Sequence, residues 1–596
     1  MQLTSLARRN VLWYWRTNLA VVAGVAVAVA VLAGALLVGA SVRSSLRALA
    51  LERLGAVDLV VTSFGYVRES LAEDLLADDG MADAVEAAAP LVAVEGFVTH
   101  QSSRSRASAV QVYGVDERFW TFHGLDPEQY DLERNTAFVS EGLAQELGAA
   151  PDDALLVRVE RPSEVPLSSL DGRRDEVGRT LRLAIVRVLP PAELGEFSFR
   201  PQQGLARSVF VPLARLQAEL EQEGRVNTVL LQAAGLSEAA AAAADVAAVE
   251  AAIRTRATLD DVGLRVRAIS AHDALSVESA AGLLDAETEA AADRAATALG
   301  LATEPVLTYL ANQIRSGGRV TPYSLVTALD LSVVSGAAGA APAAEPGPIP
   351  VVINDWTAAD LDAGPGDTLE LEYYLWEDEG RLVTREADLR VVDVVPIEGA
   401  ADDRDLAPEY RGMTDAEDVI DWDPPFDVDL SLIRPVDEEY WDDHRTTPKA
   451  FVPLAAGQQL WESRWGRVTS IRVAPAAGED LDAARERFAG ALRAELAPMA
   501  LGFVVYPARA LAGEASAGAP DFGLYFIYFS FFLVVSALLL ASLFFRLGVE
   551  QRLRELGLLR AAGFPARAVR RVFLTEGLVL SAAGSVLGVV GAVGYA

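Results

Sequence analysis

Phe522 to Phe545 reads FGLYFIYFSFFLVVSALLLASLFF, 24 residues without a charge. A second uncharged run of 24 residues extends from Leu19 to Val42. About 20 consecutive apolar residues in a helix are enough to cross the hydrocarbon core of a bilayer, so both runs predict transmembrane helices. A third apolar run, LVLSAAGSVLGVVGAVGYA, begins at Leu578 and continues to Ala596. We interpret it as the start of a third transmembrane helix, and the chain as a C-terminally truncated part of a longer protein.

Arginines beside these runs predict the orientation. Residues 546–571 carry seven arginines against two glutamates, whereas residues 510–521 carry two acidic residues and no basic one. Cytoplasmic flanks are enriched in Lys and Arg, so we expect a multi-pass protein of the cell membrane with residues 1–16 and 546–576 in the cytoplasm and residues 43–521 outside. A cleaved twin-arginine signal at Arg8-Arg9 is the alternative for the N-terminus. The apolar run is too long for it, because such regions span about 7–15 residues.

The composition disfavours several classes of function. The formal net charge is −33 although residues 1–16 and 546–596 are basic, so the external part is strongly acidic and unsuited to nucleic acid. The chain has no cysteine, which removes disulfides and thiolate chemistry. Lys449, the single lysine, stands in TTPKA without the glycines of a Walker loop. The four histidines are scattered. We therefore expect no ATP site, cofactor, metal site or catalytic residue in this chain.

The external region contains an internal repeat. Five landmarks recur in the same order: Val112–Asp116 and Val326–Asp330, Ala137–Leu147 and Val351–Leu361, Leu183–Pro190 and Leu389–Pro396, Phe210–Ala214 and Phe451–Ala455, and Gly224–Thr228 and Gly466–Ser470. Each copy closes with an Ala-rich helical stretch and a short β-type run. Alternating strands and helices in each copy indicate an α+β module. The predicted fold class is thus membrane α-helical spans plus a large external α+β region made of two tandem similar modules.

The predicted organisation follows the order of these features. It comprises a cytoplasmic N-terminus (1–16), transmembrane helix 1 (17–42), external module 1 (43–272), a connector helix (273–304), external module 2 (305–521), transmembrane helix 2 (522–545), a basic cytoplasmic helix (546–576) and the start of transmembrane helix 3 (577–596). Module 2 includes the acidic insert DAEDVIDWDPPFDVDL at residues 415–430. We expect a solvated loop there. Calcium binding is the alternative, because hard cations bind clustered carboxylates, but the EF-hand spacing is absent.

Residues 550–588, EQRLRELGLLRAAGFPARAVRRVFLTEGLVLSAAGSVLG, resemble the junction between the second and third spans of FtsX/MacB-type ABC transporter permeases. The matching positions are Glu550, Arg552, Arg554, Glu555, Gly557, Arg560, Ala561 and Gly563, followed by the pair Glu576-Gly577. VYGVD at 112–116, SEGLA at 140–144 and VFVPL at 209–213 are similar to the external domain of that family. The duplicated external domain and the missing fourth span depart from the family.

The resemblance implies a permease subunit whose basic segment is a coupling helix for a separate cytoplasmic ABC-type ATPase. The coupling residues it implies are Glu550, Arg552, Arg554, Glu555, Gly557, Arg560, Gly563 and Glu576. It also implies a dimer with a second permease copy or homologue, and a role in export, lipoprotein or lipid release, or mechanotransmission. The residues themselves leave two alternatives open. The arginines could anchor an interfacial helix to anionic lipid, and the chain could be a membrane-anchored binding or adhesion protein without a transport cycle.

Within the basic segment, the pattern predicts two faces and one turn. The buried stripe is expected to contain Leu553, Leu556, Leu559, Val569 and Val572, and the face toward a partner Arg552, Glu555 and Arg560. Gly563-Phe564-Pro565 should end the helix, because glycine suits a helix C-terminus and proline cannot continue one.

Overall fold

The computed structural model describes residues 9–162, 165, 178–200, 204–235, 239–336, 347–377, 381–408, 413–414, 416–422, 428–461, 463–496, 502–517 and 522–595. The chain divides into two compact units. One is helical and combines residues 1–55, 198–203 and 508–596; the other combines residues 56–197 and 204–507 and contains every strand of the described chain.

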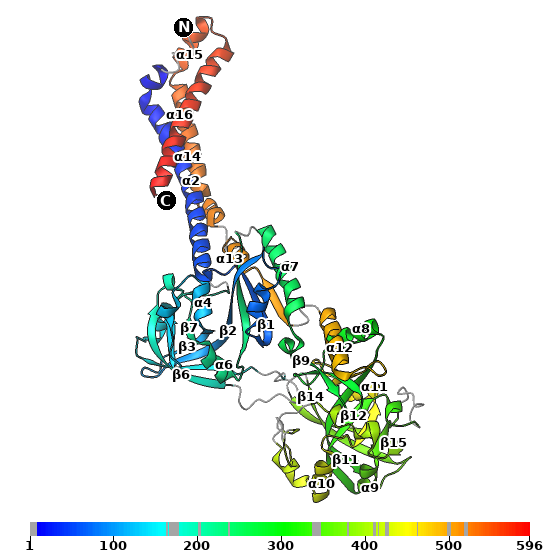
Figure 1. The fold of residues 1–596 in the computed structure, drawn as a ribbon. Coiled ribbons are helices and arrows are strands. Elements are labelled where there is room, and N and C mark those ends of the chain that lie inside the picture. Colours follow the sequence, from blue (N-terminus) through cyan, green and yellow to red (C-terminus); the bar gives the residue numbers. More distant parts are fainter. Residues whose placement is uncertain are drawn as a thin grey trace. The chain divides into compact units, whose positions relative to one another are not determined.

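Among the described residues of the first unit, three helices are long and apolar enough to cross a membrane: α2 (Trp15–Leu54), α14 (Phe522–Glu550) and α16 (Ala566–Tyr595). The shorter helices are α13 (Ala508–Ala517) and α15 (Leu553–Ala561). Helix α2 packs against both α14 and α16 (Figure 1). The helices continue past the predicted spans 17–42 and 522–545, because their polar flanks are helical too.

Glycines let these helices approach closely. A Cβ atom added to Gly584 would lie 2.8 Å from the carbonyl oxygen of Val22, and one added to Gly588 would lie 2.6 Å from that of Ala26. On α2 itself, Gly24 faces α14, where an added Cβ atom would lie 3.0 Å from the Cβ of Ala541. Lipid is as apolar as leucine, so helices in a bilayer associate through close packing at small residues. These glycines therefore hold α2 against both neighbours.

The first sheet has the strand order β18-β1-β8-β2-β3-β7-β4-β6-β5. Its strands are β1 (Leu59–Arg68), β2 (Val85–His100), β3 (Arg106–Val115), β4 (Thr136–Ser140), β5 (Ala154–Glu160), β6 (Gly178–Leu189), β7 (Ser208–Pro212), β8 (Arg225–Ala233) and β18 (Phe503–Tyr506). Strand β2 also pairs with β5, which closes β2-β3-β7-β4-β6-β5 into a six-stranded barrel. The long β2 serves both parts, because residues 85–91 pair with β8 and residues 96–100 with β5.

The second sheet has the order β12-β16-β13-β15-β14-β11-β17-β10-β9, and a β11–β12 pairing closes its barrel. Its strands are β9 (Leu264–Ile269), β10 (Ala274–Ser279), β11 (Ala302–Ser316), β12 (Arg319–Leu329), β13 (Ile349–Asn354), β14 (Thr368–Glu377), β15 (Arg381–Val395), β16 (Ala450–Pro453) and β17 (Ser470–Ala474). Taken strand for strand, β10 to β17 repeat the connections of β1 to β8. The five sequence landmarks lie on equivalent elements, so the prediction of two similar modules is confirmed.

Most helices of the two modules also correspond. The first module contains α3 (Leu71–Leu76), α4 (Glu117–Phe122), α5 (Glu141–Leu147), α6 (Leu213–Leu220) and α7 (Ala239–Arg256), and the second α8 (Ala286–Leu299), α9 (Asp355–Leu361), α10 (Pro435–His444), α11 (Leu454–Trp461) and α12 (Leu481–Glu495). The exceptions are α4, which lies between β3 and β4, and α10, which lies between β15 and β16. In each copy a buried polar residue ends a strand and caps the next helix. The Ser140 hydroxyl accepts a hydrogen bond from the Leu143 amide, and the Asn354 side chain accepts one from the Thr357 amide. Such caps satisfy a free helix amide.

The last strands of the two copies are exchanged between the sheets. Strand β9 follows α7 of the first copy but pairs with β10 in the second sheet, whereas β18 follows α12 of the second copy but pairs with β1 in the first. The exchanged strands keep the same register: Phe503 lies opposite Ser63, and Leu264 lies opposite the equivalent residue Ser279. The second module is therefore inserted between α7 and the last strand of the first.

This topology corrects the predicted boundaries. The copies are interleaved instead of forming the separate blocks 43–272 and 305–521. The connector predicted over 273–304 is helical only in α8, because residues 274–279 form β10. Leu275 and Val277 alternate with exposed or polar positions and are both buried between the neighbouring strands β17 and β9, which suits a strand.

The acidic insert lies only partly in the described chain, since residue 415 and residues 423–427 are outside it. In its described part, Val419 and Trp422 are buried against Trp441 and hold the segment on the module. The Glu438 carboxylate accepts hydrogen bonds from the backbone amides of Val419 and Ile420. Across the described residues no group of three or more acidic or histidine side chains is placed to hold a metal.

Candidate functional site

The predicted basic helix at 546–576 consists of three elements. It contains the end of α14, the whole of α15 and the first turns of α16. Helix α15 ends before Gly563, whose φ of +91° favours glycine, and α16 begins directly after Pro565. The predicted turn at Gly563-Phe564-Pro565 is therefore present, but the segment is a short helix between two long ones.

A buried ion pair joins the start of α15 to α16. The Arg552 Nη1 atom lies 2.5 Å from Glu576 Oε2, and the two side chains are only 3% and 4% exposed. In the described chain, Arg552 Nε and Glu576 Oε1 are buried without a hydrogen-bond partner. We expected Arg552 to face a partner; that expectation is wrong, because the guanidinium is turned inward to Glu576. The sequence could not reveal this, since the two residues are 24 positions apart and lie on different helices.

Tyr14, just before α2, completes this cluster. Its ring centroid lies 3.9 Å from Arg552 Cζ, and its hydroxyl donates a hydrogen bond of 2.7 Å to Glu555 Oε1. That hydrogen bond to a carboxylate raises the pKa of the Tyr14 phenol. Sequence reasoning missed this residue. The aromatic run Trp13-Tyr14-Trp15 was the available signal, because Trp and Tyr gather where a membrane helix meets water.

The other predicted positions lie on the outside of the segment. Arg554, Gly557 and Arg560 are exposed, and nothing lies within 4 Å of a Cβ atom added to Gly557. Glu550 is exposed at the end of α14, where it accepts a hydrogen bond of 3.0 Å from Arg546 Nε. The solvent-facing side of α15 thus presents two arginines beside a glycine.

The predicted buried stripe holds only in part. Val569 and Val572 of α16 are buried, and Leu556 and Leu559 are half-buried, but Leu553 is 64% exposed. Leu558, which was not in the stripe, is 73% exposed. Helix α15 is short, and Leu553 and Leu558 remain uncovered in this chain. Exposed apolar patches rimmed by polar residues mark sites of interaction with proteins or with a membrane.

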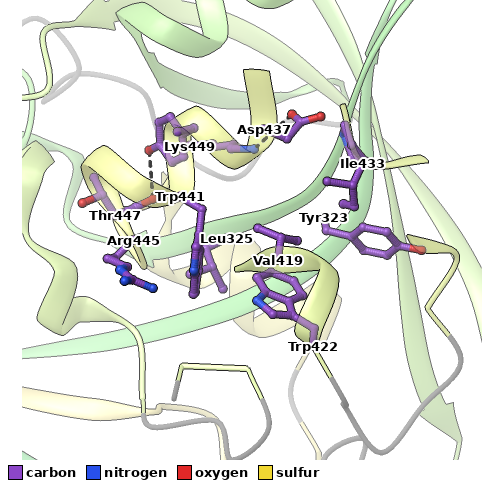
Figure 2. Close-up of a pocket in the computed structure, with 12 residues that line it drawn as sticks. Tyr323, Leu325, Val419, Trp422, Ile433, Asp437, Trp441, Arg445, Thr447 and Lys449 are labelled. Carbon is purple, nitrogen blue, oxygen red and sulfur yellow. Dashed lines mark hydrogen bonds and ion pairs between the residues drawn. The ribbon is translucent and has the colours of Figure 1, made fainter. Parts of the chain in front are cut away.

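A second cluster surrounds Lys449 in the second module (Figure 2). The Lys449 Nζ atom lies 4.7 Å and 4.9 Å from the ring centroids of Trp356 and Tyr440, and 3.9 Å from Asp437 Oδ1. Burial lowers the pKa of Lys449 to about 8. Figure 2 shows the ammonium pointing toward Asp437, beside a small pocket walled by Trp422 and Trp441. Lys449 is thus a buried cation of the module core.

Two family models match the chain, and both describe permease domains. Residues 19–256 match the MacB-like periplasmic core domain, and residues 527–596 match the FtsX-like permease C-terminal domain. With its membrane helices and external α+β modules, the chain is a permease-type protein of ABC transporters. It belongs to the FtsX/MacB-type permeases.

Solved structures resemble parts of the external region. The periplasmic region of MacB from Actinobacillus actinomycetemcomitans is 9% identical, with a TM-score of 0.22, and the match covers 34% of this chain and 85% of that one. The extracellular domain of the noncanonic ABC-type transporter YknZ from Gram-positive bacteria is 11% identical, with a TM-score of 0.22, over 35% of this chain and 94% of that one. No curated protein sequence matches the chain.

Proposed function

We propose that this protein is the permease subunit of an ABC transporter and couples ATP hydrolysis on a separate ATPase to movement of its external modules. The observation that carries the proposal is the outer face of α15, where Arg554 and Arg560 lie beside the uncovered Leu553 and Leu558. The seven arginines around this helix favour the cytoplasmic side. An ATPase on that side would contact α15 directly.

The chain connections support the transmission of force. Helix α2 leads directly into β1, and β18 leads through α13 into α14. These two strands are hydrogen-bonded neighbours, since Val60 to Ser63 lie opposite Tyr506 to Phe503. Both covalent links from the membrane helices to the external modules therefore meet in one strand pair. A relative displacement of α2 and α14 acts on that pair.

The proposal includes the topology predicted from the sequence. Residues 1–16 and 546–576 lie in the cytoplasm, residues 43–521 lie outside, and a second permease copy or homologue completes the transporter. The work done outside is export, lipid or lipoprotein release, or mechanical activation of an external partner. The strongly acidic composition of the external region favours a partner or substrate other than nucleic acid.

Association with the ATPase tests the proposal. The chain in nanodiscs is used to capture an ABC-type ATPase from the same organism, and Arg554→Glu and Arg560→Glu are compared with Arg571→Glu, an exposed arginine on α16 outside the proposed face. We expect the first two variants to bind at least about tenfold more weakly, a change of about 1.4 kcal/mol, and the third to bind normally. Equal association of all three would instead mean that the arginines of α15 bind anionic lipid.

A further inference from the structure

The segment before the first membrane helix takes part in the α15 site. Residues 9–13 are helical, Tyr14 interrupts the helix with φ −96° and ψ 33°, and α2 starts at Trp15. The Asn18 side chain holds this bend, because its Nδ2 donates a hydrogen bond of 3.0 Å to the carbonyl oxygen of Val11. The bend places the Tyr14 side chain at the start of α15.

Three segments meet at the Arg552 guanidinium. One of its faces is covered by the Tyr14 ring at 3.9 Å, and the Phe573 ring of α16 lies 5.7 Å from it. Its Nη1 atom donates a hydrogen bond to Glu576 of α16. The Tyr14 hydroxyl reaches past it to Glu555, one turn into α15. The cluster is therefore closed on itself: the N-terminal segment, α15 and α16 each contribute a side chain to it.

Burial couples the movements of the side chains that meet at Arg552. A guanidinium that is 3% exposed cannot exchange Glu576 for water when α15 moves. It must carry Glu576 and the ring of Tyr14 with it, because cation–π contact and ion pairing both strengthen in a desolvated site. A displacement of α15 would then reach the start of α2 through Tyr14, in addition to reaching α14 and α16 through the backbone.

We propose that Tyr14 is a positioning residue that locks the start of α2 to α15, so that all three membrane helices follow a movement imposed on α15. The lock is formed within this chain and does not need a bound ATPase. Its use in transport rests on the proposed function. The first consequence is that Tyr14→Leu frees the N-terminal segment, whereas Tyr14→Phe keeps the ring on Arg552 and retains most of the lock.

Distance measurements between two spin labels test the lock. The chain has no cysteine, so single cysteines at the exposed positions Leu12 and Ala562 accept nitroxides without further changes. In nanodiscs without an ATPase, we expect a narrow distance distribution in the parent chain and in Tyr14→Phe, and a broad one in Tyr14→Leu. Tyr528→Leu, an exposed tyrosine of α14, is the matched control and should leave the distribution narrow. A narrow distribution in Tyr14→Leu would overturn the proposal.

A second measurement asks whether the lock carries movement. With the ATPase bound, addition of a non-hydrolysable ATP analogue should leave the distance between the two labels unchanged in the parent chain, because both segments move together. In Tyr14→Leu the same addition should shift the distance, because α15 moves alone. A nucleotide-dependent shift of equal size in both chains would overturn the proposal. Failure of the ATPase to bind the parent chain would overturn the proposed function, while the measurement without ATPase would still decide on the lock.

Discussion

Replacing Arg552 by methionine should strongly destabilise the helical unit. The substitution keeps the volume and apolar stem of the side chain but leaves the Glu576 carboxylate, which is only 4% exposed, without its partner. Breaking a buried ion pair on one side typically costs about 3–5 kcal/mol. For a domain of 150–250 residues, each kcal/mol lowers Tm by about 2–4 °C, so the expected loss is about 6–20 °C.

The double variant Arg552→Met, Glu576→Leu separates the charge effect from a packing effect. It removes both buried charges together, and replacing a whole buried pair by apolar residues is often neutral or stabilising by about 1–4 kcal/mol. We therefore expect the double variant to recover most or all of the parent stability. Arg546→Met is the matched control. It makes the same change in the exposed Arg546–Glu550 pair, whose side chains are 78% and 53% exposed, and should cost at most about 1 kcal/mol.

The measurement is the apparent Tm of the purified chain in nanodiscs, followed by intrinsic fluorescence and by loss of the monodisperse peak. Equal stability of Arg552→Met and Arg546→Met would contradict this prediction, because the Arg552–Glu576 pair would then be solvated. A double variant that loses as much stability as the single variants Arg552→Met and Glu576→Leu lose together would also refute it. Independent effects of that kind would show that Arg552 and Glu576 do not interact.

Three further predictions follow from other parts of the structure. Gly588→Leu should separate α16 from α2 and lower stability by about 1–3 kcal/mol, as overpacking does. Gly591→Leu should leave stability unchanged, because an added Cβ atom there meets nothing within 4 Å. Thermal scans of the two variants compare these effects. Folding lowers the pKa of Lys449 from 10.5 to about 8. Between these two pH values the unfolded chain keeps a proton that the folded chain has lost. Stability should therefore rise by about 3 kcal/mol in total from pH 8 to 10.5, and the rise should be absent in Lys449→Met, as pH-dependent unfolding would show. Finally, cysteines at Thr62 and Val504, which lie opposite each other, should form a disulfide within one chain, whereas a cysteine at the equivalent position of β9 should not crosslink to β1.

The membrane helices and the repeat were predictable because each depends on a local pattern. An uncharged run of 24 residues needs no tertiary information to be recognised. The repeat was visible because landmarks such as Phe210–Ala214 and Phe451–Ala455 combine a buried strand with the start of a helix. The order of such units limits the possible topologies strongly.

The strand exchange was not predictable from those patterns. Both β9 and β18 follow an Ala-rich helix, and both fit the edge of a sheet in the same register. What separates them is a set of side-chain contacts that differs between the two copies. Arg267 of β9 is paired with Glu278 of β10 and with Asp405, and β1 has Thr62 where β10 has Glu278. Pairing preferences between strands come from such cross-strand neighbours, which a single strand does not reveal.

The same limit explains the error at Arg552. A helical pattern places an arginine on the polar face unless a buried partner is known, and here the partners Glu576 and Tyr14 are supplied by two other segments. A charged side chain is buried only where a partner compensates its charge. The exposed positions Arg554 and Arg560 needed no such information, and they lie where the pattern predicts.

The exchanged strand also determines how a movement of the membrane helices would act on the external modules. Strands β1 and β18 are antiparallel, and Val60 near the start of β1 lies opposite Tyr506 at the end of β18. The chain enters β1 from α2 at that end and leaves β18 toward α13 at the same end. A force that separates α2 from α14 therefore opens the pair from this end, one residue pair after another, and does not shear all four pairs at once. Since β18 is joined through residues 497–501 to α12 of the second module, the strand that would yield first is also the one that connects the membrane to that module.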